Sequence, residues 1–209
     1  MISMKHTDGC RAIGITGGVG SGKSRVLGYL SEVTECSIFT ADDEAKKLYV
    51  PGSPVFDGLV AILGEDVLDE KGEIIKARMA DRIFSDGTIL ERINALVHPA
   101  VKDVILRRMK EEKESGIREF FFVEAALLLE CGYDAILDDI WYVYASEEVR
   151  EERLMRTRGY SSEKVRSIFA AQLSSEEYRS RCGEVIDNDS TIEHMKESVD
   201  RILRKVRGS

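Results

Sequence analysis

The sequence predicts an α/β fold in which helices flank a parallel sheet, and three observations support this prediction. Short apolar runs typical of buried strands recur along the chain. Long segments with helical spacing of apolar residues separate these runs, as parallel strands require. A glycine-rich segment, residues 17–24, lies between the first apolar run and the first helical segment. Strand, glycine-rich loop and helix in this order are typical of a site that binds phosphate groups.

The segment 17–24 fills every fixed position of the phosphate-binding pattern G-x-x-x-x-G-K-[ST]. Glycines allow backbone conformations that a β-carbon blocks, so that successive N–H groups converge on a polyphosphate. We expect Lys23 to bridge the terminal phosphates of a nucleoside triphosphate and Ser24 to bind Mg²⁺. The alternative is a glycine-rich turn without a ligand, and the filled motif and its flanks argue against it.

The remaining elements follow in a regular order. The expected strands are residues 12–16, 36–40, 120–124, 140–145 and 184–186. The spacing predicts helices at 43–49, 54–63, 76–84, 87–97 and 99–114, with no convincing strand among them. A charge-rich helical stretch at 147–181 and a last helix at 192–206 complete the pattern.

This order predicts a core with two helical additions. The nucleotide-binding core is expected to comprise residues 10–42 and 117–209. The helical insertion at 43–116 is the natural place for a substrate-binding subdomain. The charged stretch, within about 147–181, is expected to form a mobile lid.

Composition and charge restrict the function classes. The chain of 209 residues, 43% hydrophobic and 33% charged, is long enough to bury the core of one α/β domain with appendages. Its net charge of -8 argues against nucleic acid or a membrane surface as the main partner. Residues 1–9 lack the apolar centre of a signal peptide, and no stretch is apolar enough to span a membrane. The cysteines are far apart without a C-x-x-C pair, which favours reduced thiols and a cytoplasmic protein.

Two carboxylates stand where strands end, at the edge of the sheet where such folds bind ligands. Asp42 follows the apolar run 37–41 and is a candidate to orient or deprotonate an acceptor hydroxyl. A helix N-cap is an equally supported interpretation of Asp42. Glu124 ends the apolar run 120–124. In phosphate-loop enzymes an acidic residue at the end of such a strand holds Mg²⁺ through water. Without the loop upstream, Glu124 would be read as part of a core strand.

His98 and the arginines of the charged stretch are further candidates. His98 is expected to open the helix at 99–114, where an imidazole could donate to a phosphate or ribose hydroxyl, although a lone histidine more often caps or packs. Arginines begin the expected lid at positions 150, 153, 156 and 158. Guanidinium groups suit phosphate oxygens, but neighbouring glutamates make a solvated face the simpler interpretation for most of them. We expect one or two to be functional, Arg153 first.

With these residues assembled, the chain resembles the dephospho-CoA kinase family from Ile13 to about Val206. The loop opens on Thr-Gly-Gly like that of the family, and the family's Asp-Ala-Asp falls on residues 40–42. Further family positions are matched, in order, by Pro51, Gly52, Leu90, Ile93, His98, Pro99, Leu127, Leu128, Glu130, Arg153, Ala171, Gln172, Val185, Ile186, Asp187 and Asn188.

The resemblance implies phosphorylation of the ribose 3′-hydroxyl of dephospho-CoA, the last step of coenzyme A synthesis, with ATP and Mg²⁺ as cofactors. The expected catalytic residues are Asp42, Lys23 and Arg153. The expected nucleotide-binding residues are Gly18, Val19, Gly20, Ser21, Gly22, Lys23, Ser24, Arg25 and Asn188. The expected acceptor-binding residues are Asp42, Lys46, His98, Leu127 and Gln172, and the metal ligands Ser24 and Glu124. The expected partner is the small-molecule substrate, and the expected state is a monomer or small homo-oligomer.

The chain departs from the family pattern at several positions. The departures are Thr40 for an aspartate, Lys46 for an arginine, Ala126 for a proline and Cys182-Gly183 for Ala-Asp. The base position, Asp42, is kept, which implies an active but divergent member. Two alternatives stay open: a related kinase of another nucleotide or small metabolite, and a nucleotide- or CoA-binding homologue without catalysis. A regulatory GTPase would need an Asn-Lys-x-Asp segment, which the sequence lacks.

Overall fold

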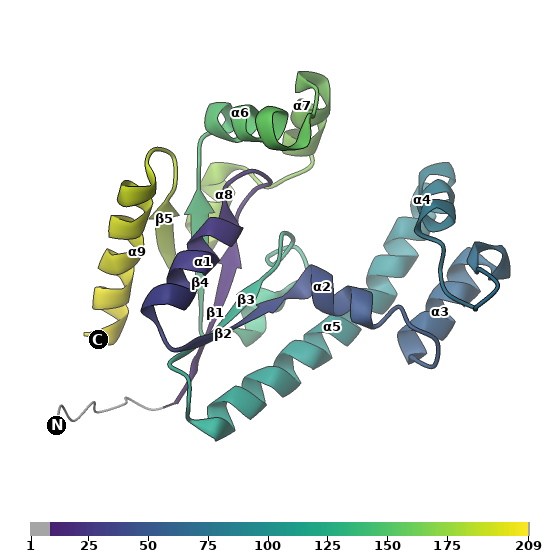
Figure 1. Ribbon diagram of the computed structural model, residues 1–209, viewed down its shortest axis with the longest axis horizontal. Coiled ribbons are helices and arrows are strands. Elements are labelled where there is room, and N and C mark those ends of the chain that lie inside the picture. Colours follow the sequence, from purple (N-terminus) through teal and green to yellow (C-terminus); the bar gives the residue numbers. More distant parts are fainter. Residues whose placement is uncertain (1–8, 209) are drawn as a thin grey trace. The chain divides into compact units, whose positions relative to one another are not determined.

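The chain divides into two units in a computed structural model that describes residues 9–208 (Figure 1). The first unit extends to residue 39 and resumes at residue 109, and the second comprises residues 40–108. The expected boundaries were 43 and 116. The later one differs because the end of the longest helix belongs to the first unit, where Lys113 Nζ lies 3.3 Å from Asp138 Oδ2.

The first unit is built on a five-stranded sheet with the strand order β2-β3-β1-β4-β5. The strands are β1 (Arg11–Thr16), β2 (Cys36–Thr40), β3 (Phe120–Glu124), β4 (Asp139–Tyr144) and β5 (Glu184–Asp187). β1 pairs in parallel with β3 and β4, and β4 pairs in parallel with β5. The predicted α/β class is therefore confirmed, and the carboxyl ends of these strands meet at one edge of the sheet.

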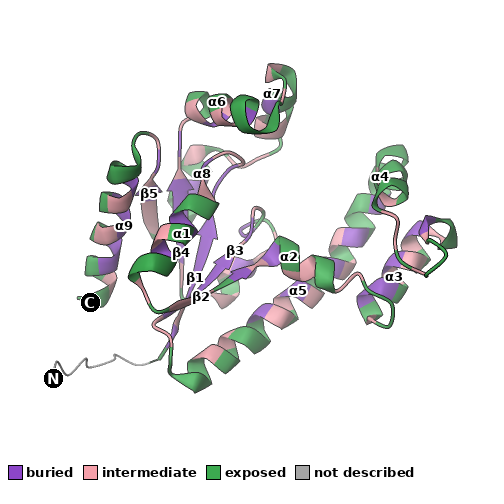
Figure 2. Ribbon diagram, viewed as in Figure 1, coloured by how far each residue is buried: buried purple, intermediate pink, exposed green. Residues whose placement is uncertain are grey.

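Helices cover both faces of this sheet. On one face α1 (Lys23–Val33) and α9 (Ile192–Arg207) bury a core that includes Ile15, Trp141 and Val199. On the other, α8 (Ser175–Arg181) places Tyr178 against Tyr142, with ring centroids 4.8 Å apart. Figure 2 shows that the central strands β1, β3 and β4 are mostly buried and that the edge strands β2 and β5 are mostly not. Burial on both faces explains why the central strands are apolar runs and not alternating patterns.

The charged stretch is helical, as the sequence predicts, and it is divided into three helices. These are α6 (Glu147–Arg158), α7 (Ser162–Ala170) and α8. Each begins after a serine, Ser146, Ser161 or Ser174, whose side chain accepts a hydrogen bond from a backbone N–H of the first turn. Such caps satisfy donors that have no partner inside the helix, so they fix where each helix starts.

The second unit contains α2 (Ala41–Lys47), α3 (Pro54–Leu63), α4 (Lys76–Ser85) and most of α5 (Gly87–Ser115). Two single-turn helices, Glu65–Val67 and Tyr133–Ile136, complete the described elements, the latter in the first unit. α3 lies close to α5 at Gly58, where a β-carbon would be 2.6 Å from the Leu96 side chain. The absence of a side chain at Gly58 therefore sets the spacing of these helices.

The prediction of two helices separated before Pro99 is wrong, because α5 runs through that proline. Proline removes one backbone hydrogen bond and favours a break. Buried side chains nevertheless recur every four residues on both sides of it, at Ile89, Ile93, Val97, Val101 and Ile105. Packing along this stripe outweighs the local preference. His98 consequently lies inside a helix and not at its N-terminus.

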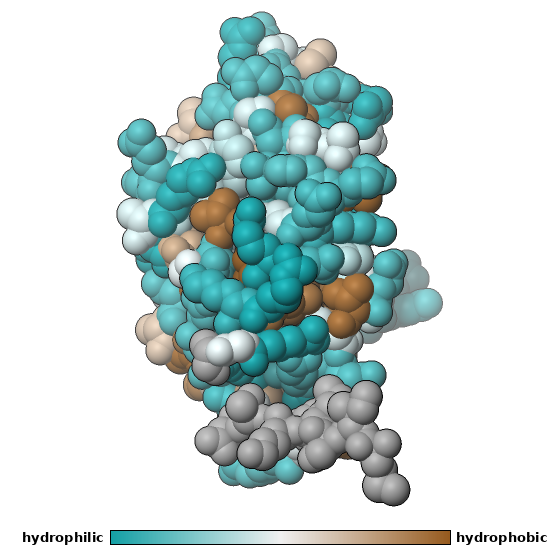
Figure 3. Space-filling view, turned by 90° about the vertical axis from the view of Figure 1, so that its left-hand side faces the viewer, coloured by the Kyte–Doolittle hydropathy of each residue, from teal (hydrophilic) through white to brown (hydrophobic). Residues whose placement is uncertain are grey.

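The side of the first unit formed by α9 is covered mainly by hydrophilic side chains, and apolar ones form separate spots there (Figure 3). The buried side of α9 carries Met195, Val199, Ile202 and Leu203. Over residues 9–208, helices that combine the length and the apolar character needed to cross a bilayer are absent.

Candidate active site

The phosphate loop follows the central strand β1 and depends on glycine conformations. Gly17, Gly20 and Gly22 have φ values of 148°, 85° and 92°, in the region that residues with a β-carbon rarely adopt. A β-carbon on Gly17 would also lie 2.5 Å from the carbonyl oxygen of Val143 in β4. The loop is therefore fixed by backbone packing against the neighbouring strand.

The N-terminus of α1 has no side-chain cap. Gly22 occupies the capping position in a left-handed conformation, and the backbone N–H groups of Arg25 and Val26 donate to its carbonyl oxygen. The first turn of α1 contains no acidic residue, and Ser24 in that turn is exposed. A helix start without a cap or a carboxylate is suited to bind an anion.

Lys23 and Glu124 meet at the carboxyl edge of the sheet. Lys23 Nζ donates to the carbonyl oxygen of Gly17 at 2.8 Å and lies 3.8 Å from Glu124 Oε1. The register that aligns Glu124 with Ile15 of β1 brings this carboxylate to the loop. The structure thus brings together the expected phosphate-binding lysine and the expected metal carboxylate.

These residues fit a magnesium ion bound together with a nucleotide. Among residues 9–208, no group of three or more His, Cys, Asp or Glu side chains is arranged to hold a metal. Mg²⁺ in phosphate-transfer enzymes takes only one or two protein ligands and completes its shell with phosphate oxygens and water. The Ser24 hydroxyl and the Glu124 carboxylate are a donor set of this kind.

Arg150 is buried beside the loop and is only 5% exposed. Its Nε donates to the carbonyl oxygen of Val19 at 2.9 Å, and its Nη2 donates to Gln172 Oε1 at 2.6 Å. The guanidinium also lies 4.2 Å from the ring centroid of Phe169. Burial lowers the pKa of Arg150 below its ordinary value. Among the described residues no carboxylate forms an ion pair with Arg150, and the negative charge of Glu147 offsets only part of the effect of burial on its pKa, so a buried positive charge lies next to the phosphate loop.

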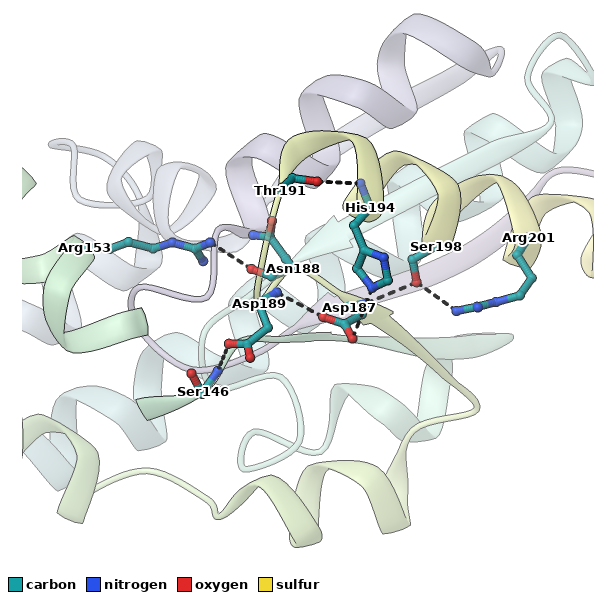
Figure 4. A network of polar contacts seen from close by, with 9 residues as sticks. All are labelled: Ser146, Arg153, Asp187, Asn188, Asp189, Thr191, His194, Ser198 and Arg201. Carbon is teal, nitrogen blue, oxygen red and sulfur yellow. Dashed lines mark hydrogen bonds and ion pairs between the residues drawn. The ribbon is translucent and has the colours of Figure 1, made fainter. Parts of the chain in front are cut away.

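Arg153 and Asn188 hold the second half of the loop, and Figure 4 shows the contact between these two residues. Arg153 donates to the carbonyl oxygens of Ser21 at 3.3 Å and of Asn188 at 2.8 Å. Asn188 Nδ2 donates to the Ser21 carbonyl oxygen at 2.6 Å, and the asparagine is 1% exposed. Burial, and after it the charge of Arg25, lowers the pKa of Arg153. In this arrangement Arg153 contacts the backbone of the loop.

The end of β5 is anchored on both sides of Asn188 (Figure 4). Asp189 Oδ1 accepts from the backbone N–H of Ser146, at the start of α6, at 2.6 Å. Asp187 Oδ2 lies 3.4 Å from His194 Nε2 of α9, and the backbone N–H of Asp187 donates to Ser198 Oγ at 3.1 Å. These contacts connect α6, β5 and α9, and they fix the backbone that positions Asn188 and Arg153.

Three expected acceptor residues lie in the second unit. Asp42 is the second residue of α2, and the capping position belongs to Thr40, so the interpretation of Asp42 as an N-cap is wrong. Lys46 is exposed and pairs with Asp43 at 2.7 Å. Burial lowers the pKa of His98 inside α5. In the first unit, Leu127 is 42% exposed in the turn after β3.

Two features of the structure, one at the site and one at the opposite edge of the sheet, were not predicted from the sequence. The contacts of Arg150 were missed because Arg153, on the same helical face, matched the family position. At Gly183, where the sequence departs from the family pattern, the carboxylate of Asp139 occupies the space of a side chain. A β-carbon on Gly183 would lie 2.2 Å from Asp139 Oδ1. Asp139 accepts hydrogen bonds from its neighbour's backbone N–H and from Trp141 Nε1. Gly183 and Asp139 are therefore a matched pair, and only their proximity in the sheet shows it.

The strand order, the phosphate loop and its lysine define a phosphate-loop kinase. The sequence matches the family model described as dephospho-CoA kinase over residues 11–194. The chain belongs to the dephospho-CoA kinase family, and it is an ATP-using kinase.

Individual relatives agree with this membership. The chain is 34% identical over 193 residues to the dephospho-CoA kinase of Carboxydothermus hydrogenoformans, covering 92% of this chain and 93% of that protein. The same identity over 193 residues relates it to the enzyme of Geobacter sulfurreducens, with 92% and 97% covered.

Solved structures share the fold. A Thermus thermophilus protein superposes with a TM-score of 0.78 at 28% identity, covering 95% of this chain and 99% of that one. The dephospho-CoA kinase of Campylobacter jejuni gives 0.70 at 19% identity, covering 94% and 97%. A shikimate kinase from Acinetobacter baumannii gives 0.55 at 14% identity, covering 95% and 94%, which extends the likeness of fold to another phosphate-loop kinase.

Proposed function

We propose that the protein transfers the terminal phosphoryl group of ATP to the ribose 3′-hydroxyl of dephospho-CoA, giving CoA and ADP. Family membership supports this substrate. The observation that carries the proposal is the phosphate loop, with its open α1 terminus and with Lys23 beside Glu124. This combination supplies the positive potential and the donors that phosphoryl transfer needs.

ATP would bind at the phosphate loop and at the residues that hold the loop in place. The backbone N–H groups of the loop and Lys23 would hold the β- and γ-phosphates, with the α1 dipole adding a favourable field. Arg25, in the first turn of α1, would contribute positive charge. Asn188 would support nucleotide binding indirectly, because its amide holds the carbonyl oxygen of Ser21 in the loop.

Ser24 and Glu124 would hold Mg²⁺, Ser24 through its hydroxyl and Glu124 through water. When bound, the ion neutralises negative charge on the transferring phosphate and its leaving group. Lys23 contacts both the loop and Glu124. Substitution of Lys23 or Glu124 is therefore expected to change the position of the other side chain.

Asp42 would orient the 3′-hydroxyl and receive its proton as the oxygen attacks the terminal phosphorus. Arg153 would support catalysis by holding the loop in the geometry that the transferred phosphate requires. Lys46, His98 and Leu127 are proposed to contact the acceptor. Closure of α6 and α7 over the site would exclude water and so limit wasteful hydrolysis of ATP.

The buried guanidinium of Arg150 beside the loop favours the binding of an anion there. The retained Lys23, Ser24 and Asp42 favour catalysis over the alternative of a nucleotide-binding homologue without activity. We also propose a cytoplasmic enzyme that works as a monomer or small homo-oligomer.

An acceptor panel tests the proposal. Dephospho-CoA, adenosine, AMP and shikimate would be compared at equal concentration with ATP and Mg²⁺, following ADP release and confirming the phosphorylated position by ³¹P NMR. The highest kcat/KM is expected for dephospho-CoA, with phosphate on the 3′-oxygen. A higher kcat/KM for another acceptor would reject the substrate and leave the kinase chemistry standing.

A further inference from the structure

We propose that Gln172 is a positioning residue for nucleotide binding, which fixes the first half of the phosphate loop together with Arg150. It is not an acceptor-binding residue. This inference rests on the proposed assignment of the loop as the ATP site. It concerns how the described residues hold that loop, and it is independent of which molecule accepts the phosphate.

Gln172 joins two partners through one oxygen. Its Oε1 accepts from the backbone N–H of Val19 at 3.2 Å and from Arg150 Nη2 at 2.6 Å. The glutamine follows the last turn of α7, where its own backbone N–H donates to the carbonyl oxygen of Phe169 at 3.0 Å. The position of Oε1 is therefore set by the end of α7.

Val19 is held through both of its backbone polar groups. Gln172 takes its N–H, and Arg150 Nε donates to its carbonyl oxygen at 2.9 Å. Val19 lies within a turn that the Ser21 N–H closes onto the Gly18 carbonyl oxygen at 3.1 Å. Side chains from α6 and from the end of α7 thus set the conformation of the turn, and the loop N–H groups after Val19 stay directed toward the phosphate site.

The chemistry of this arrangement favours positioning. Both hydrogen-bond acceptors of Arg150, the Val19 carbonyl and the Gln172 carboxamide, are neutral, so no negative charge is hydrogen-bonded to the guanidinium. A β-carbon on Gly18 would lie 2.3 Å from Arg150 Nη2, which shows how closely the guanidinium approaches the loop. Without the Gln172 oxygen, Arg150 Nη2 and the Val19 N–H would both lose their acceptor, and the guanidinium would be held by the bond to the Val19 carbonyl oxygen and by the contact with Phe169.

Titration of Mg-ADP by calorimetry, without any acceptor, tests the inference on Gln172→Met. Loss of a hydrogen bond to a charged group is expected to weaken Mg-ADP binding about tenfold or more, while the KM for dephospho-CoA stays within about twofold. Gln172→Asn, which keeps the amide but shortens its reach, is expected to behave in the same way. It also serves as the test if Gln172→Met does not fold.

A double-mutant cycle and a control complete the experiment. Because Gln172 contacts both Arg150 and the Val19 N–H, the two substitutions are expected to be less than additive, and the double variant Arg150→Met/Gln172→Met should bind Mg-ADP only slightly more weakly than Arg150→Met alone. Ser167→Ala, on the exposed side of α7, should bind as the wild type does. Unchanged Mg-ADP affinity in folded Gln172 variants, or a raised KM for the acceptor alone, would overturn the inference. If the wild type binds Mg-ADP but fails to phosphorylate dephospho-CoA, the proposed function fails and the binding result still stands.

Discussion

The carboxylate of Asp139 in β4 fills the space beside Gly183, so that a β-carbon on the glycine would lie 2.2 Å from Asp139 Oδ1. The same carboxylate accepts from the indole N–H of the fully buried Trp141 at 3.1 Å. A departure from the family pattern just before β5 is thereby matched by an aspartate on the neighbouring strand. The fold at this position does not require the family's own residue.

This pair predicts a non-additive effect on stability. Gly183→Ala is expected to cost about 1–3 kcal/mol of unfolding free energy through overpacking. Asp139→Ala is expected to cost about 1–3 kcal/mol because the Trp141 N–H loses its acceptor. In the Asp139→Ala background, Gly183→Ala should cost little, since the clash is gone. Urea unfolding of the four proteins measures the cycle, and strictly additive costs would show that the two residues do not compete for space.

Asn188 predicts a loss of both stability and nucleotide binding. Asn188→Asp removes the amide donor and places a carboxylate against the carbonyl oxygen of Ser21, which is expected to cost about 1–3 kcal/mol. Mg-ADP binding should weaken in parallel because the loop loses its support. Asp189→Asn is the matched control, because it keeps the oxygen that accepts from Ser146. Equal Mg-ADP affinity in Asn188→Asp and Asp189→Asn would contradict this role.

Asp42→Asn separates catalysis from structure. The substitution keeps the shape of the side chain at the second position of α2, so only a small change in melting temperature is expected. Loss of a general base should lower kcat on the order of 10²-fold or more, with ATP affinity largely preserved. The melting temperature, kcat and ATP affinity are measured on one preparation of Asp42→Asn. An unchanged kcat would exclude Asp42 as the base and direct attention to Glu124.

His98 predicts a pH dependence of stability. Burial lowers its pKa in the folded protein below the ordinary value of 6.5, so the unfolded chain binds this proton more tightly. His98 therefore makes no difference to stability well above pH 6.5, and it destabilises the folded state increasingly as the pH falls below that value. His98→Gln should lose less unfolding free energy than the wild type when the pH is lowered from about 7.5 to about 5. Parallel curves for the two proteins would contradict the assignment.

The sequence was sufficient for the features that follow local rules. The phosphate loop and its strand and helix were predicted because glycines, Lys23 and apolar runs have fixed spacing. The continuity of α5 through Pro99 was not predictable, because a distant packing stripe decides it. The contacts of Arg150 and the pairing of Asp139 with Gly183 depend on residues far apart in the chain, which no local pattern brings together.

CoA formation by the wild type and by Lys23→Ala tests directly whether this phosphate loop carries out ATP-dependent phosphorylation of dephospho-CoA. The wild type is expected to convert dephospho-CoA and ATP to CoA and ADP in equal amounts. Lys23→Ala, folded as judged by circular dichroism and melting temperature, is expected to be slower by roughly 10²–10³-fold or more. Wild-type turnover in a correctly folded Lys23→Ala protein would contradict the account.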